Sequence, residues 1–116
     1  MMSDAGEEIQ ALFDDASGDV AIGDLPAAVE KYRRCTELDP ENFEAWHALG
    51  MALSKTGDLK KAIGAAMMAT TLKPNDQLAW TALSQMYMQD GQIPEAEAAK
   101  QNATVLGIGG KIDRSS

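Results

Sequence analysis

Apolar residues recur at intervals of three and four along most of the chain, which is the spacing of one face of an α-helix. The pattern predicts six helices: one from Glu7 through Val20, and five over residues 25–38, 43–55, 59–72, 77–89 and 93–106. Gly18 interrupts the first of these patterns. Because a glycine costs a helix about 1 kcal/mol relative to alanine, we expect a bend or break near residues 17–19.

The turns between these helices repeat at a fixed interval. Gly57-Asp58 lies 34 residues after Gly23-Asp24 and 34 before Gly91-Gln92, and Pro74 lies 34 residues after Pro40. Asn42 and Asp76 directly precede predicted helices, where their side chains suit N-caps. A period of this length is typical of a repeat protein, in which each unit buries its apolar face only against its neighbours.

The residues within each period resemble the tetratricopeptide repeat (TPR) family. Its pattern places Trp, Leu, Gly and Tyr on a first helix, and Ala, an aromatic and Ala on a second, before a Pro. Six of these eight positions match in the middle unit: Trp46, Leu49, Gly50, Ala62, Ala69 and Pro74. The third unit matches with Trp80, Leu83, Tyr87, Ala96 and Ala103, whereas the first keeps only Ala28, Tyr32 and Pro40.

The resemblance implies an all-α fold, a right-handed superhelical stack of three helix-turn-helix hairpins. The expected TPR domain covers residues 9–110, with repeats at 9–42, 43–76 and 77–110. We expect residues 1–8 to be disordered or frayed and residues 111–116 to form a disordered tail. Glu97 and Lys100 occupy the positions through which a last helix would meet a further repeat. Their charges predict that this face is exposed to water.

Composition and charge narrow the class of partner. The net charge is −8, and residues 1–42 hold 11 acidic and 3 basic residues, so the whole imbalance lies in the first repeat. An acidic chain without a basic stripe is a poor ligand for nucleic acid or an anionic membrane. With no apolar run of about 20 residues, no secretory signal and a single cysteine, we expect a cytoplasmic protein.

The sequence offers little for catalysis. Its one histidine, His47, and one cysteine, Cys35, fall at different repeat positions, and Cys35 takes the place of a small packing residue. The aspartates between residues 14 and 24 lack the glycine and glutamate of a calcium loop. No zinc-ligand spacing or phosphate-binding loop is present. We therefore expect no enzyme activity, no metal and no cofactor.

In this family the first helices of the repeats line a concave groove, which the resemblance implies is the ligand site. An apolar thread in that groove, with two methionines, suits a flexible apolar or amphipathic segment. The groove residues of the first repeat are equally consistent with a place in the hydrophobic core. The expected groove residues are Phe13, Ser17, Val20, His47, Met51, Lys55, Leu78, Thr81, Gln85 and Met88.

Two further features bear on the partner. TPR proteins that grip the C-terminal carboxylate of heat-shock chaperones use Lys, Asn and Arg at positions held here by Phe13, Ser17, Ala48, Leu78 and Ala82. That carboxylate clamp is absent. On the opposite, convex side, Gly64, Ala65 and Met68 form a bare patch of small or uncharged residues where the first repeat has charges. A homodimer through this patch is the less favoured alternative.

The sequence therefore predicts a non-enzymatic adaptor or scaffold that binds a peptide or helix of a protein partner in its concave groove. Two alternatives remain open. One is a chaperone-like escort that shields an apolar segment of a client protein. The other is a structural module that associates with itself through the convex patch.

Overall fold

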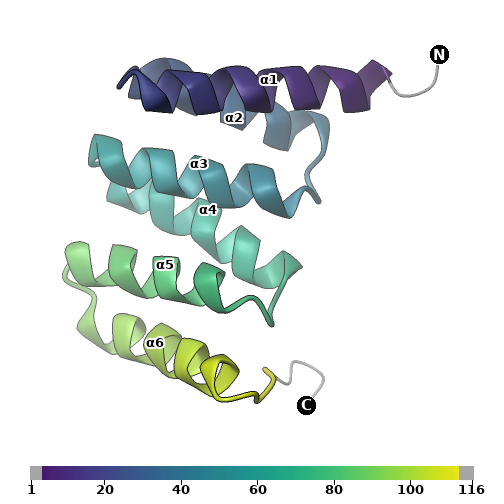
Figure 1. Cartoon of the computed structure of the whole chain (residues 1–116). Coiled ribbons are helices and arrows are strands. Elements are labelled where there is room, and N and C mark those ends of the chain that lie inside the picture. Colours follow the sequence, from purple (N-terminus) through teal and green to yellow (C-terminus); the bar gives the residue numbers. More distant parts are fainter. Residues whose placement is uncertain (1–3, 113–116) are drawn as a thin grey trace.

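The computed structural model describes residues 4–112, and within that range it contains six helices and no strand (Figure 1). Five helices begin and end within one residue of the predicted positions. The helices are α1 (Asp4–Ala21), α2 (Leu25–Leu38), α3 (Phe43–Thr56), α4 (Leu59–Leu72), α5 (Gln77–Gln89) and α6 (Ile93–Gly107).

Helix α1 is the element that the sequence predicted least well. It starts at Asp4, so residues 4–8 are helical rather than frayed, and it continues unbroken through Gly18 to Ala21. A Cβ added at Gly18 would meet nothing within 4 Å, so no close contact requires a glycine there. The helix instead gains from Ala16, which is fully buried, and from Phe13 and Val20, which pack against the core. This packing outweighs the local cost of one glycine.

Aspartate and asparagine side chains start most of the helices. Each accepts a hydrogen bond from the backbone N–H three residues later, which satisfies one of the free donors of the first turn. These caps are Asp24, Asn42, Asp58 and Asp76. At the ends of α1, α3 and α5 the chain turns through a glycine with positive φ, namely Gly23, Gly57 and Gly91. The glycine and Asp or Asn residues that recur along the sequence thus form equivalent turns and helix N-caps.

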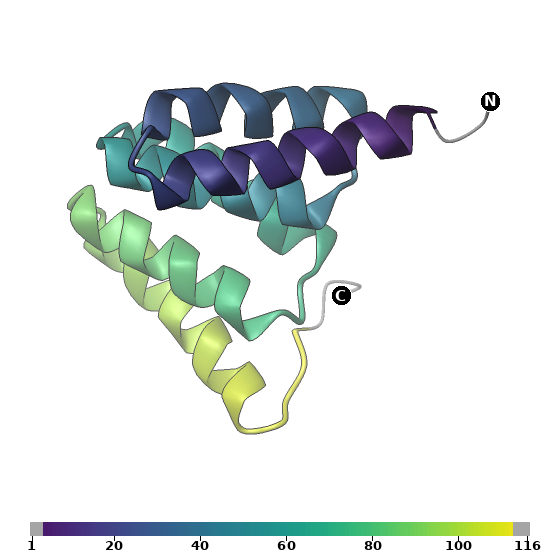
Figure 2. The ribbon, with the colours of Figure 1, turned by 45° about the horizontal axis from the view of Figure 1, so that its top comes forward.

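The six helices form two layers. Helices α1, α3 and α5 make the inner layer, and α2, α4 and α6 make the outer one (Figure 1). Each helix packs against the next in the chain, and the last hairpin runs at an angle to the first, as expected of a superhelical stack (Figure 2). Gly50 lies where α3 approaches α4, and a Cβ there would come 3.3 Å from the Ala62 carbonyl oxygen. The absent side chain allows this close approach.

The second and third hairpins begin with the same hydrogen bond. The Trp46 indole N–H donates to the carbonyl of Pro40 at 2.8 Å, and the Trp80 indole N–H donates to the carbonyl of Pro74 at the same distance. These two bonds show that the turns into the second and third hairpins have equivalent geometry, and each hairpin packs on the next through α2 with α3 and α4 with α5. On the last helix, Glu97 and Lys100 are exposed, as predicted.

Near the C-terminal end of the described residues, Lys111 and Ile112 lie outside any helix. The backbone N–H of Ile112 donates to the Asn75 side-chain oxygen at 2.9 Å, which ties this short stretch to the turn before α5. The remainder of the predicted tail, residues 113–116, and the first three residues of the predicted N-terminal segment lie outside the described residues.

Candidate functional site

The inner face is the surface formed by the ten groove residues predicted on α1, α3 and α5. On α1, Phe13 and Val20 are half-buried and pack against the core. The Phe13 ring meets the Tyr32 ring edge to face with centroids 5.2 Å apart, and the Ser17 and Tyr32 hydroxyls are 2.9 Å apart in a hydrogen bond. These side chains therefore support the first hairpin at least as much as they line the groove.

On α3, the three inner-face residues differ in exposure. His47 is half-buried and stacks on the Phe43 ring, with centroids 5.7 Å apart and planes at 9°. Met51 is 37% exposed, and Lys55 is exposed. The middle of the inner face is thus an accessible methionine flanked by an imidazole and an ammonium group.

On α5, the inner face is mostly open and uncharged. Leu78 is 72% exposed and Met88 is 46% exposed, which are large values for such side chains in a small domain. Gln85 is exposed, and Thr81 is half-buried with its hydroxyl donating to the Gln77 carbonyl at 3.0 Å. We call Met51, Leu78 and Met88 the apolar strip, because they are the exposed large apolar side chains among the ten inner-face residues and lie on two helices.

A shallow hollow of about 230 Å³ lies where α1 meets the start of α3. It is lined by Ile9, Gln10, Phe13, Asn42 and Glu44, of which Phe13 belongs to the inner face. Glu44 pairs with Lys73 at 3.5 Å. This end of the inner face is therefore more polar than the end on α5.

The convex patch predicted from the sequence is only partly a surface. Gly64 is exposed and a Cβ there would meet nothing within 4 Å, whereas Ala65 is only 3% exposed and Met68 is half-buried. Ala65 therefore belongs to the hydrophobic core and not to an exposed patch. Gly64 and Ala65 form part of one wall of a larger hollow on the outer layer.

This first outer furrow runs between α2 and α4, with α3 as its floor, and holds about 550 Å³. Its floor contains Trp46, Leu49 and Leu53, and its rim is charged. Arg33 on the rim forms ion pairs with both Glu30 and Glu37. The lining residues are Val29, Glu30, Arg33, Thr36, Glu37, Trp46, Leu49, Leu53, Lys61, Gly64 and Ala65.

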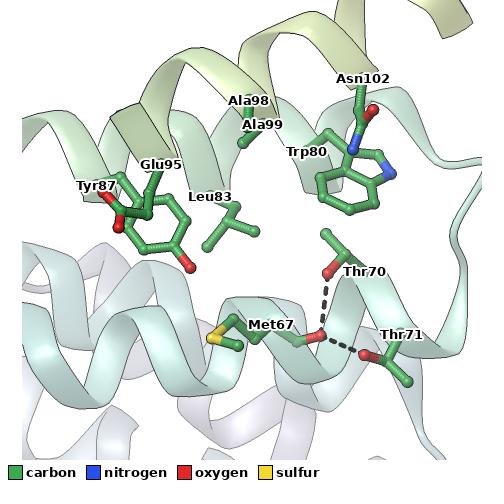
Figure 3. Close-up of a pocket in the computed structure, with 10 residues that line it drawn as sticks. All are labelled: Met67, Thr70, Thr71, Trp80, Leu83, Tyr87, Glu95, Ala98, Ala99 and Asn102. Atoms are coloured by element: carbon green, nitrogen blue, oxygen red, sulfur yellow. Dashed lines mark hydrogen bonds between the residues drawn. The ribbon is translucent and has the colours of Figure 1, made fainter. Parts of the chain in front are cut away.

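A second outer furrow of about 330 Å³ runs between α4 and α6, with α5 as its floor (Figure 3). Leu83 lies at its centre, Tyr87 and Glu95 lie together at one end, and Trp80 and Asn102 lie at the other. Met67, 48% exposed, forms part of the α4 wall. The lining residues are Met67, Thr70, Thr71, Trp80, Leu83, Tyr87, Glu95, Ala98, Ala99 and Asn102.

The sequence analysis did not find the second outer furrow, although a signal for it was present. Moving by one period from Gly64 and Ala65 leads to Ala98 and Ala99, which form its α6 wall. Moving from Arg33 and Glu37 leads to Met67 and Thr71, so the charges of the first rim are replaced by uncharged side chains. Comparing the outward positions of α2 and α4 would have predicted this second surface.

The groups considered for chemistry are held in structural roles. The Cys35 thiol is buried and donates to the Ile9 carbonyl at 3.6 Å, and burial raises its pKa above the ordinary value. A thiol in this state is a poor nucleophile. No group of three His, Cys, Asp or Glu residues suited to a metal ion occurs within the described part of the chain. Between residues 4 and 112, none of the six helices combines the length and apolar character needed to cross a bilayer.

Comparison with known proteins finds a family model and solved structures that agree on the fold. The family model for the tetratricopeptide repeat matches residues 31–64. The MamA structure from AMB-1 superposes with a TM-score of 0.84 at 26% identity, covering 96% of this chain and 61% of MamA. No curated protein shows a significant sequence match.

Two further structures share the fold at lower identity. The type III secretion translocator chaperone SycD of Yersinia enterocolitica gives a TM-score of 0.82 at 17% identity, covering 89% of this chain and 78% of SycD. The first TPR of Spaghetti (RPAP3), solved with an HSP90 peptide, gives 0.83 at 14% identity and covers 89% and 82%.

The matched residues 31–64 run from α2 through α3 into α4, across the junction of the first two hairpins. The third hairpin repeats the geometry of the second, and the whole fold superposes on MamA. Residues 31–64 therefore match the tetratricopeptide repeat, and the described chain as a whole has the fold of tetratricopeptide repeat structures.

Proposed function

We propose that the chain is a non-enzymatic protein-interaction module, an adaptor or scaffold, that binds a peptide or helix of a partner protein on its inner face. One observation carries this proposal: Met51, Leu78 and Met88 are exposed on α3 and α5. An accessible apolar strip on a folded domain is typical of an interaction site.

The chemistry of the strip indicates the kind of segment it takes. Methionine side chains are flexible and polarisable, so they adapt to irregular apolar surfaces. The α5 end of the inner face carries no charge, since its residues are Leu78, Thr81, Gln85 and Met88. An amphipathic helix or extended segment with an apolar face would therefore bind there with its polar side toward solvent.

A C-terminal carboxylate is not the expected ligand. The matching positions hold Phe13, Ser17, Ala48, Leu78 and Ala82, and of these only Ser17 has a side-chain donor. That hydroxyl is already hydrogen-bonded to Tyr32. The likeness to the HSP90-peptide complex of Spaghetti concerns the fold, at 14% identity.

An escort role is the second candidate. The same exposed strip could shield an apolar segment of one client protein, and SycD, whose fold is similar, is a secretion translocator chaperone. The two roles differ in what happens to the partner. If the chain is an escort, the captured protein loses solubility when it is expressed without this chain, whereas a partner of an adaptor remains soluble.

The decisive experiment is affinity capture with a double variant, Met51→Glu plus Met88→Glu. We expect these two charges to abolish capture, because a buried unpaired carboxylate at an interface costs several kcal/mol. The matched control is Gln101→Glu plus Thr104→Glu, which adds the same two charges at exposed positions of α6 outside both outer furrows. Circular dichroism and thermal melting should show both variants folded. Partners that are still captured by the folded inner-face variant would contradict the proposal.

A further inference from the structure

The second outer furrow combines an apolar interior with a single charge. Leu83 is 4% exposed on its floor, and Ala99 is 3% exposed on its α6 wall. Trp80 and Tyr87 are half-buried along the same floor and present ring surface to the opening (Figure 3). An apolar channel of this kind is suited to cover by another side chain rather than to water alone.

The one charged group that lines the furrow is Glu95, in the first turn of α6. It is exposed, and no basic side chain among residues 4–112 comes within ion-pair distance of it. Its carboxylate lies beside the Tyr87 ring (Figure 3). Burial and this carboxylate both raise the pKa of the Tyr87 hydroxyl above its ordinary value.

On the rim of the first outer furrow, by contrast, the charged side chains are paired with one another. There, Arg33 pairs with two glutamates on its own helix, and Lys61, the residue equivalent to Glu95, lies 3.9 Å from Asp58. Each cation on that rim already has an anion in the same chain. Among the residues that line the second furrow there is an anion and no cation, so a basic side chain of another molecule would complement it.

We propose that the second outer furrow binds an apolar segment of a partner protein that carries a lysine or arginine. The stem of this side chain lies along Leu83 and Ala99, and its charged end meets the Glu95 carboxylate and the Tyr87 ring. Long basic side chains combine an apolar stem with a charged end. A carboxylate attracts that end as an ion pair, and a neighbouring aromatic ring adds a cation–π interaction.

Two other features favour such a segment. The small side chains of Ala98 and Ala99 allow a helix or strand to come close to α6, and the exposed Met67 can adjust to it from α4. This site lies on the outer layer, so it is independent of the inner face and of the function proposed for it.

The test uses a phage-displayed library of random 16-residue segments, panned on the whole chain. Selected clones are then measured against four variants. Ala98→Arg fills the furrow and repels a cation, Glu95→Gln removes the charge, and Gln101→Arg adds the same bulk and charge on an exposed part of α6 outside the furrow. The inner-face double variant identifies clones that bind the groove. All four changes are at exposed residues, so the fold should persist, as circular dichroism would show.

We expect a class of clones that carries a lysine or arginine at a common position. Ala98→Arg should weaken these clones by more than about tenfold, and Glu95→Gln by about threefold at low salt, because an exposed ion pair contributes little more than that. Gln101→Arg and the inner-face variant should leave their affinity unchanged. The proposal is overturned if no clone is sensitive to Ala98→Arg, or if the sensitive clones lack a basic residue or ignore Glu95→Gln.

Discussion

The two outer furrows are built from equivalent positions of the repeat and differ almost entirely at their rims. Trp46 and Leu49 on the first floor correspond to Trp80 and Leu83 on the second, with the same indole hydrogen bond. On the rims, the charges of α2 give way to uncharged side chains on α4. Interior positions are constrained because each hairpin must pack on the next, whereas rim positions meet solvent and can diverge.

The junctions beneath the furrows differ as well. Lys60 on α4 pairs with Asp90 at the end of α5 at 2.8 Å, and the Ser54 hydroxyl donates to the Gln89 side chain at 3.3 Å. These bonds connect the second hairpin to the third. One period earlier, the positions of Lys60 and Asp90 hold Pro26 and Thr56, so the first junction lacks this ion pair. The first junction therefore depends more completely on apolar contact.

The largest expected effect comes from the shared floor. Leu49→Ala and Leu83→Ala should each lower the free energy of unfolding by about 2–5 kcal/mol, because the two leucines are only 5% and 4% exposed and their truncation leaves a cavity. Urea denaturation measures both. A loss below about 1 kcal/mol for one of them would show that the two floors are not equivalent.

A smaller effect should follow from changing the first rim. Arg33→Met removes the ion pairs to Glu30 and Glu37 and should cost about 0.5–1 kcal/mol, since exposed pairs on a helix contribute little. The loss should shrink in high salt. The reverse change at the equivalent position, Met67→Arg, should leave stability nearly unaltered, because the acidic neighbours of Arg33 correspond to Gly64 and Thr71 there. If the stability lost in Arg33→Met does not change with salt concentration, the ion pairs of the first rim are not its cause.

The smallest effect concerns the ion pair of the second junction and depends on pH. Hydrogen bonds from Lys60 and from Gln92 lower the pKa of the Asp90 carboxyl in the folded chain. A lowered folded pKa stabilises the fold above the unfolded value, about 3.9, and this contribution disappears as pH falls through the folded value.

Asp90→Asn should therefore be less stable than the native chain at pH 7, and the difference should fade below about pH 4. Urea midpoints at pH 7 and pH 3 measure it. Lys60→Met provides the matched variant, and combining it with Asp90→Asn should add nothing further. A difference that persists unchanged at pH 3 would assign the loss to something other than this carboxylate.

Much of the fold could be predicted because the signals are local. Caps, prolines and glycine turns lie near the ends of the helices, and five helices were predicted to within one residue. The break expected at Gly18 was wrong, because tertiary packing of Ala16, Phe13 and Val20 outweighs the cost of one glycine. The inner-face residues stay a prediction, with Met51, Leu78 and Met88 exposed as a binding surface requires.

By itself, the sequence determined the six helices, the three hairpins and the placement of the negative charge, because turns, caps and apolar periodicity act over a few residues. Only the tertiary structure decided that Ala65 is buried, that Tyr87 and Glu95 meet in one furrow, and which methionines remain open to solvent. Periodicity identifies the apolar face of each helix. The neighbour that covers this face depends on the angle at which one hairpin packs on the next, and contacts distant in sequence set that angle.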